Sequence, residues 1–359
     1  MLQRGRVSTG VLSRVVWFGL FVLVCVGINE SLSKEAEPAI GREVWSLDLR
    51  AAGYVFNETS PPEQPEAGRD IVIGDNGEVI VLGGRPDFEN AYTVTGFVLN
   101  AEGKLVRSQT WPARYARSVV ATAKGNYVVM TESGLAVYSR GLERQLASAS
   151  RAAAFESPSG KSLGVRSARN GMRETVFLDS ETLADVSLTF TNDHNVESIS
   201  DDSITYATYL SRSRWPVIRV EDRSGVIGTY DSECDEVHSR FVAKDAVIVL
   251  GCGHMDVISL RGERVFREEI NHGSWLAAVS REGRRFAMVN AKYSRGKEPK
   301  LMSEEFTIYD IPSRKALATV RIEDLKGRHR GRTGAALAGD GSSLAVNSLG
   351  MVHLYKLPE

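Results

Sequence analysis

The sequence predicts an all-β protein, a seven-bladed β-propeller with four-stranded blades, and three observations support this fold class. Short alternating or apolar runs bounded by Gly, Asp, Asn and Ser follow one another, with no convincing helical periodicity beyond the Pro-rich segment around Pro61. The runs recur in groups of four along the chain. The last group lacks one strand, and a lone strand near the N-terminus is available to complete it.

One turn-and-strand phrase shows the repeat, since it reads SPSGKSLGVRS from Ser157, SREGRRFAMVN from Ser280 and GDGSSLAVNS from Gly339. Gly or Asp recurs in this first turn because a tight hairpin needs positive φ or an Asx hydrogen bond. Seven copies are marked by Gly77, Gly125, Gly160, Asp202, Asp245, Gly283 and Gly341. From 77 to 341 is 264 residues over six intervals, a mean of 44. A period of about 40–50 residues with four strands per unit is typical of propeller blades.

The seventh copy predicts how the ring closes. Its runs GAALAG, SSLAVNS and MVHLYKL make three strands before the chain ends at Glu359. The run EVWSLDL, from Glu43 to Leu49, can pair beside MVHLYKL as the fourth strand of the last blade. An N-terminal strand that completes the last blade would hide edges that otherwise promote aggregation.

The N-terminal residues resemble an export signal. Arg4, Arg6 and Arg14 precede an uncharged run of 14 residues, Val15 to Ile28. A helix of that length rises about 21 Å, which is short of the roughly 30 Å hydrocarbon core. We therefore expect a signal peptide over residues 1–33, and a periplasmic or secreted protein. The alternative is an uncleaved membrane anchor formed by residues 15–28.

Two segments follow in the predicted organisation, a polar lead over residues 34–41 and the propeller domain over residues 42–359. Cleavage would remove Cys25 and leave Cys234 and Cys252 in an oxidising compartment, which favours a disulfide. If AKD turns the hairpin after the first strand of the fifth blade, Cys252 faces position 236, two residues from Cys234. We predict the Cys234–Cys252 disulfide; two buried free thiols are the alternative.

Long insertions indicate a binding face. They span 84–92, 211–216, 292–304 and 325–333, and all fall in connections expected on one face of the ring. They are mostly basic, and arginine pairs well with carboxylate and phosphate. The predicted ligand-binding residues are Arg212, Arg214, Trp215, Arg328, Arg330 and Arg332. Solvated loops with ordinary surface charge are the alternative.

The overall charge limits the choice of partners. Lys and Arg total 44 and Asp and Glu total 45, so the net charge of -1 gives no reason to expect nucleic acid. We expect a monomer that binds a protein or an anionic ligand outside the cytoplasm. Contact with a membrane is expected only through the N-terminal segment, if it is uncleaved.

A metal centre is a second possible site. His194, His254 and His272 lie in connections on the same face, near Asp or Asn side chains that a divalent ion could use. No two histidines have a metal-type spacing, so the ligands would have to converge from three blades. We expect no cofactor; a divalent metal belongs to the alternative reading, a hydrolase or lactonase-like propeller enzyme with a metal in the central funnel.

The phrases SPSGKSLGV…ETVFLDSETL and SREGRRFAMVN…EEFTIYDIPSRKALATV resemble the repeats of bacterial exported propellers, the WD-repeat-like and YVTN-like group. The resemblance covers roughly residues 42–359 and implies the fold, but it implies no particular activity. No blade carries the Gly-His to Trp-Asp pair of true WD repeats. The expected function is therefore a binding or scaffolding module, with no catalytic residue assigned.

Overall fold

Short runs rich in β-branched and aromatic residues, separated by turn residues, form strands along the chain. A computed structural model describes residues 38–55, 70–86, 92–113, 116–151, 153–169, 172–191, 195–210, 215–235, 237–271, 273–294, 301–323 and 333–359. Residues 39–359 form one folded unit. The predicted signal peptide, the anchor segment 15–28 and the first half of the polar lead, residues 34–37, lie outside the described residues. Within the described residues, no helix is both long and apolar enough to span a membrane.

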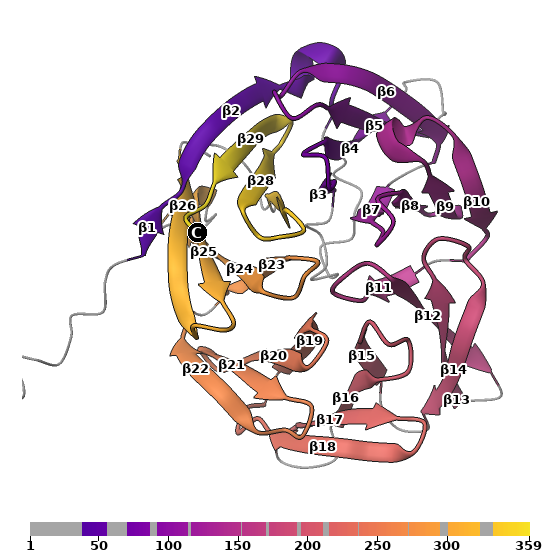
Figure 1. Ribbon diagram of the computed structural model, residues 1–359, viewed down its shortest axis with the longest axis vertical. Coiled ribbons are helices and arrows are strands. Elements are labelled where there is room, and N and C mark those ends of the chain that lie inside the picture. Colours follow the sequence, from indigo (N-terminus) through magenta and orange to yellow (C-terminus); the bar gives the residue numbers. More distant parts are fainter. Residues whose placement is uncertain are drawn as a thin grey trace, which may run out of the picture. The chain divides into compact units, whose positions relative to one another are not determined.

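The strands form seven antiparallel sheets arranged as a ring (Figure 1), so the predicted seven-bladed propeller is confirmed. Blade 1 contains β3 (Ile71–Ile73), β4 (Val79–Pro86), β5 (Tyr92–Leu99) and β6 (Leu105–Pro112); blade 2 contains β7 (Ala116–Ala121), β8 (Tyr127–Thr131), β9 (Gly134–Tyr138) and β10 (Gln145–Ala149). Blade 3 contains β11 (Ala153–Glu156), β12 (Ser162–Arg169), β13 (Met172–Asp179) and β14 (Asp185–Thr191); blade 4 contains β15 (Asn195–Ile199), β16 (Tyr206–Leu210), β17 (Val217–Asp222) and β18 (Gly225–Asp231).

The remaining blades follow in chain order. Blade 5 contains β19 (Val237–Ala243), β20 (Ala246–Gly251), β21 (His254–Ser259) and β22 (Arg264–Glu269); blade 6 contains β23 (Trp275–Val279), β24 (Arg285–Tyr293), β25 (Leu301–Asp310) and β26 (Lys315–Ile322). Blade 7 contains β27 (Gly334–Leu337), β28 (Ser343–Ser348) and β29 (Met351–Lys356), and its outer strand is β2 (Arg42–Asp48). Two short 3-10 helices, η1 (Leu49–Ala52) and η2 (Arg140–Leu142), are the helical elements of the described residues.

The predicted closure of the ring is confirmed. β2 pairs antiparallel with β29, from Arg42 opposite Lys356 to Asp48 opposite Met351. Figure 1 shows the indigo β2 outside the yellow β29. The indole of Trp45 also donates a 2.9 Å hydrogen bond to the carbonyl of Ala101 in blade 1. One strand from the N-terminus therefore secures the last blade to the first.

A second N-terminal strand was not foreseen. β1 (Ala39–Ile40) lies in the segment expected as polar lead and pairs in parallel with Ala318 and Thr319 of β26. Gly41 follows and packs closely on blade 6, since a Cβ at this position would lie 2.5 Å from a methyl of Val320 in β26. The N-terminal segment therefore pairs first with blade 6 and then with blade 7.

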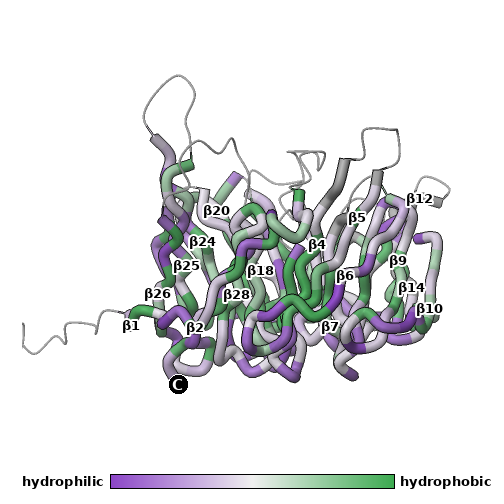
Figure 2. Tube along the Cα trace, turned by 90° about the horizontal axis from the view of Figure 1, so that it is seen from above, coloured by the Kyte–Doolittle hydropathy of each residue, from purple (hydrophilic) through white to green (hydrophobic). Residues whose placement is uncertain are grey.

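The core lies between the blades rather than in one central layer. Among the described residues, buried apolar side chains form seven clusters, and each cluster joins two neighbouring blades. Phe155 and Phe177 of blade 3, for example, pack with Val196 and Ile199 of blade 4. Figure 2 shows the hydrophobic strands in the middle of the ring's height. Each blade is therefore stabilised by its two neighbours, which makes closure important.

Two predicted loops are partly strand. The expected insertion 84–92 contains the ends of β4 and β5, which remain paired from Gly84 opposite Val94 to Pro86 opposite Tyr92. The expected insertion 292–304 contains the ends of β24 and β25. Local backbone pairing accounts for the difference, because two strands that leave a sheet together can keep hydrogen bonding beyond it.

Candidate functional site

The strand order gives the ring two different faces. Connections from second to third strands, and from each blade to the next, leave one face, which we call the loop face. The turns from first to second and from third to fourth strands lie on the other, which we call the turn face. Turns on the turn face are short, as in Gly74–Gly77 and Thr122–Gly125, each closed by a backbone hydrogen bond of 3.0 Å. The two faces therefore offer different surfaces to a partner.

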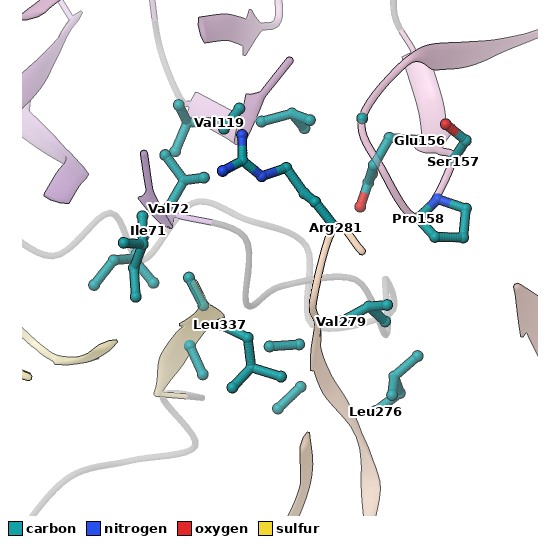
Figure 3. Close-up of a pocket in the computed structure, with 18 of the residues that line it drawn as sticks. Ile71, Val72, Val119, Glu156, Ser157, Pro158, Leu276, Val279, Arg281 and Leu337 are labelled. Carbon is teal, nitrogen blue, oxygen red and sulfur yellow. The ribbon is translucent and has the colours of Figure 1, made fainter. Parts of the chain in front are cut away.

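A pocket, which we call the channel, lies at the ring axis between the first strands of the blades. Its apolar wall includes Ile71, Val119, Leu276 and Leu337, from β3, β7, β23 and β27. Figure 3 shows these side chains around one space, together with polar Glu156 and Arg281. An apolar wall with a few convergent polar groups is the usual composition of a ligand site.

Charged side chains bridge this channel. Arg240 on β19 of blade 5 forms an ion pair with Glu156 at the end of β11 in blade 3. Both side chains are mostly buried, with exposed fractions of 25% and 14%. Burial of one of these charges alone would be costly, so each stabilises the other. The ion pair thereby joins blades 3 and 5, which are not neighbours.

Arg281 makes the second bridge at the turn face. It lies in the turn after β23 of blade 6 and forms an ion pair with Asp75 in the first turn of blade 1. It also donates a 3.2 Å hydrogen bond to the carbonyl of Thr122 in blade 2. In Figure 3 its side chain extends toward Val72 and Val119. The guanidinium therefore occupies the turn-face end of the channel.

A hollow of about 510 Å³ lies beside Arg281 on the turn face. Its charged lining includes Asp75, Glu282 and Asp340. Burial opposes ionisation of Asp340, but hydrogen bonds from the Ser342 backbone and hydroxyl, with the charge of Lys356, hold its pKa below the usual value. The only cation lining this hollow, among the described residues, is Arg281, which Asp75 already pairs.

One predicted ligand-binding residue can be placed. Trp215 lies two residues before the start of β17, on the loop face, and 37% of its surface is exposed. Part of its aromatic surface therefore faces solvent. The other five predicted ligand-binding residues, Arg212, Arg214, Arg328, Arg330 and Arg332, lie outside the described residues.

The predicted disulfide is present. Cys234 and Cys252 are bonded, with Cα atoms 5.7 Å apart. The β19–β20 register places Val237 opposite Gly251, so the expected alignment near Cys252 holds even though the turn is Ala243 opposite Ala246. The bond fixes the two-residue turn Cys252–Gly253 on the loop face.

His254 follows that turn and opens β21, opposite Glu269 of β22. Its Nδ1 atom is buried and has no hydrogen-bond partner among the described residues. His194 and His272 lie outside the described residues, so the predicted metal set cannot be assembled from described positions. Three or more His, Cys, Asp or Glu side chains suited to a metal do not come together within the described part of the chain. The metal site stays a prediction.

Sequence reasoning missed the residues of the channel. Glu156 and Arg240 had a usable signal, because each is a charged residue within the first strand of a copy, AAAFES and VHSRFVA, where apolar residues predominate. Arg281 and Asp75 had none, because charged residues are ordinary in turns. Only the ring geometry brings these turns together.

Comparison with known proteins identifies the fold and not the family. No family model matches the sequence, and no curated protein matches it. A chain of the "Crystal Structure of Mitotic Checkpoint Complex" superimposes with a TM-score of 0.54 at 13% identity, over 92% of this chain and 96% of that one. A chain of "Kuenenia stuttgartiensis Hydrazine Synthase" gives a TM-score of 0.50 at 14% identity, over 84% of this chain and 98% of the other. The protein is a seven-bladed β-propeller, a fold that is consistent with a binding or scaffolding module.

Proposed function

We propose that the protein is an exported β-propeller binding module of the bacterial type, which presents a basic loop face to an anionic protein or ligand outside the cytoplasm. It belongs, in this proposal, with the WD-repeat-like and YVTN-like repeat group that its sequence resembles. The alternative is a hydrolase or lactonase-like propeller enzyme with a metal in the central funnel.

The observation that carries this proposal is the difference between the two faces. The four long insertions predicted from the sequence, 84–92, 211–216, 292–304 and 325–333, are mostly basic, and all of them join strand ends on the loop face. Strands held by seven interblade clusters provide a rigid base for those connections. Binding residues usually occupy loops on such a base.

Charge pairing in the channel supports the same assignment. Arg240 and Arg281, which could otherwise bind an anion at the axis, are engaged by Glu156 and Asp75. An anionic partner would therefore bind the loop arginines, and the exposed Trp215 would provide a surface for stacking.

The disulfide supports export. Cys234–Cys252 joins two loop-face segments, and such bonds persist in oxidising compartments and are rare in the reducing cytosol. This bond and the N-terminal sequence together support the proposed periplasmic or secreted localisation.

Binding of a short polyglutamate peptide to the exported protein tests the proposal, with a triple variant Arg328→Ala, Arg330→Ala, Arg332→Ala. We expect at least a roughly tenfold loss of affinity at low ionic strength, where exposed charges act most strongly. The matched control is Lys124→Ala, Lys161→Ala, Lys244→Ala, which removes three lysines from the turn face. Equal affinity in the two triple variants would contradict a basic binding face.

The alternative enzyme has its own measurement. If the central funnel holds a metal, analysis of the exported protein after dialysis should find about one divalent ion per chain. A substoichiometric value supports the binding module.

A further inference from the structure

A polar groove lies between blades 5 and 6, away from the channel and from the predicted ligand-binding residues. Its volume is about 340 Å³, within the roughly 300–1,000 Å³ of small-molecule sites. The residues that line it and carry hydrogen-bonding side chains include two carboxylates, two amides and two hydroxyls. They are Glu269, Asn271, Ser274, Asn290, Glu305 and Thr307.

Strand register directs three of these side chains into the groove. Asn290 of β24 lies opposite Glu305 of β25. Met288 lies opposite Thr307, and side chains two residues apart share one face of a sheet. Met288 and Tyr309 on that face pack against apolar residues of blade 5. Asn290, Glu305 and Thr307 therefore continue the contact between the two blades as a polar surface.

The connection from blade 5 to blade 6 completes the groove. It contributes Glu269, at the end of β22, together with Asn271 and Ser274. The Ser274 amide donates a 3.0 Å hydrogen bond to the Asn271 carbonyl, which closes this connection as a turn. Because such connections lie on the loop face, the groove lies on that side of the ring.

Other residues of the chain leave the polar groups of the groove unused. Within the described part of the chain, the side chains of Asn290, Glu305 and Thr307 form no hydrogen bond or ion pair with another residue. Arg321, which the β25–β26 register places opposite Glu305, pairs with Glu323 at 3.3 Å instead. Polar groups that are half-buried and have no protein partner are open to water or to a ligand.

The corresponding place between blades 4 and 5 is filled by the protein itself. Asp256 of β21 corresponds to Thr307, because each directly precedes the two residues between which the pairing with the outer strand shifts register. Asp256 is 4% exposed. It accepts hydrogen bonds from the Arg267 guanidinium at 2.8 and 2.9 Å and from the Tyr230 hydroxyl at 2.8 Å. Blades 4 and 5 thus satisfy their own polar groups here, whereas blades 5 and 6 do not.

The mixture of groups in the groove selects a class of ligand. An anion would meet the two carboxylates of Glu269 and Glu305, and like charges repel. A cation would bind the oxygen atoms but has no lone pair to accept hydrogen bonds from the Asn271 and Asn290 amides. A hydroxyl group both donates and accepts, so a neutral ligand with several hydroxyls matches every group.

We propose that the groove between blades 5 and 6 binds a small neutral sugar. Glu305 accepts hydrogen bonds from sugar hydroxyls, and these bonds are strong because the acceptor is charged. Asn290 and Thr307, on the same face of the sheet, donate and accept beside it. The site goes beyond the proposed function, because it does not use the basic loops and takes a ligand of a different class.

NMR of the isotope-labelled exported protein tests the proposal. The neutral probes are glucose, galactose, mannose and N-acetylglucosamine, and glucuronate is the charged counterpart. At least one neutral sugar is expected to shift the side-chain amide signals of Asn271 and Asn290 below about 50 mM. Glucuronate is expected to bind at least about tenfold more weakly than the best neutral sugar, because of the two carboxylates.

Two substitutions that preserve side-chain size locate the site. Glu305→Gln is expected to weaken binding of the best neutral sugar at least about tenfold, and Thr307→Val about fivefold. The matched control is Glu102→Gln, an exposed glutamate in the β5–β6 turn on the turn face, which should bind as the wild type does.

Three results would overturn the proposal. The first is that no neutral sugar shifts the Asn290 signal. The second is that glucuronate binds as tightly as the neutral sugars, and the third is that both groove variants keep wild-type affinity.

Discussion

Blades 5 and 7 are both fastened by something beyond their own hairpins, but in opposite ways. In blade 7 the fastening is a strand from the other end of the chain, with Asp48 opposite Met351, 303 residues later. In blade 5 it is a covalent bond between cysteines 18 residues apart. The first closes the ring, and the second fixes one turn on its loop face.

The difference shows what each fastening must overcome. Closing a long loop costs more conformational entropy than closing a short one. Packing along the whole length of β2 must therefore offset the larger entropy cost of closing the ring. Leu49 is fully buried at its end, and Trp45 and Leu47 pack against the cluster between blades 7 and 1. The disulfide needs no such packing, because it is formed by local register.

Removing the closure is expected to have the largest effect. Deletion of Glu43–Leu49 exposes the edge of β29 and the cluster around Leu49, and should lower the free energy of unfolding by more than about 5 kcal/mol. Deletion of Glu30–Pro38, which precedes the folded unit, serves as the control. Chemical denaturation followed by tryptophan fluorescence measures both. Equal unfolding midpoints would show that β2 does not hold the ring.

Removing the disulfide comes second. Cys234→Ala with Cys252→Ala should cost about 3 kcal/mol in the chain-entropy account of a short loop, without opening the ring. Amide exchange is expected to increase on the loop face near Gly253 and to stay unchanged in blade 7. Increased exchange in β29 would mean that the two fastenings are not independent.

The smallest expected effect is a pH dependence of stability at the contact between blades 7 and 1. Asn347 of β28 donates hydrogen bonds to Asp70 (2.6 Å) and to the Tyr54 hydroxyl (3.0 Å), while the Asp70 Oδ1 atom is buried with no hydrogen-bond partner among the described residues. Burial raises the pKa of Asp70 to about 7.

Because the folded pKa lies above the unfolded one, the stabilising contribution is complete below about pH 4 and is lost as pH rises to about 7. The wild type should lose stability over this interval, and Asp70→Asn should not. The double cysteine variant should keep the pH dependence. An Asp70→Asn variant with the wild-type slope would assign the pH dependence to another group.

Turn chemistry shows how far local sequence reaches. Gly77, Gly125, Gly160, Gly283 and Gly341 all have positive φ, as their turns require. Asp202 acts differently, since its carboxylate accepts backbone hydrogen bonds from Ile204 and Thr205 while Ser203 takes the left-handed conformation. Asp245 lies in a two-residue turn instead. The repeat period is preserved despite these different turns, because the spacing between turns, rather than the identity of the turn residue, marks a blade.

The sequence by itself determined the number of blades, the strand that closes the ring and the disulfide, because each depends on spacing or on alternation along short segments. Only the tertiary structure decided the channel pairs Arg240–Glu156 and Arg281–Asp75 and the second N-terminal strand on β26. These features join residues from different blades, or depend on what covers a strand. Their partners are chosen by the curvature of the ring, which no local pattern encodes.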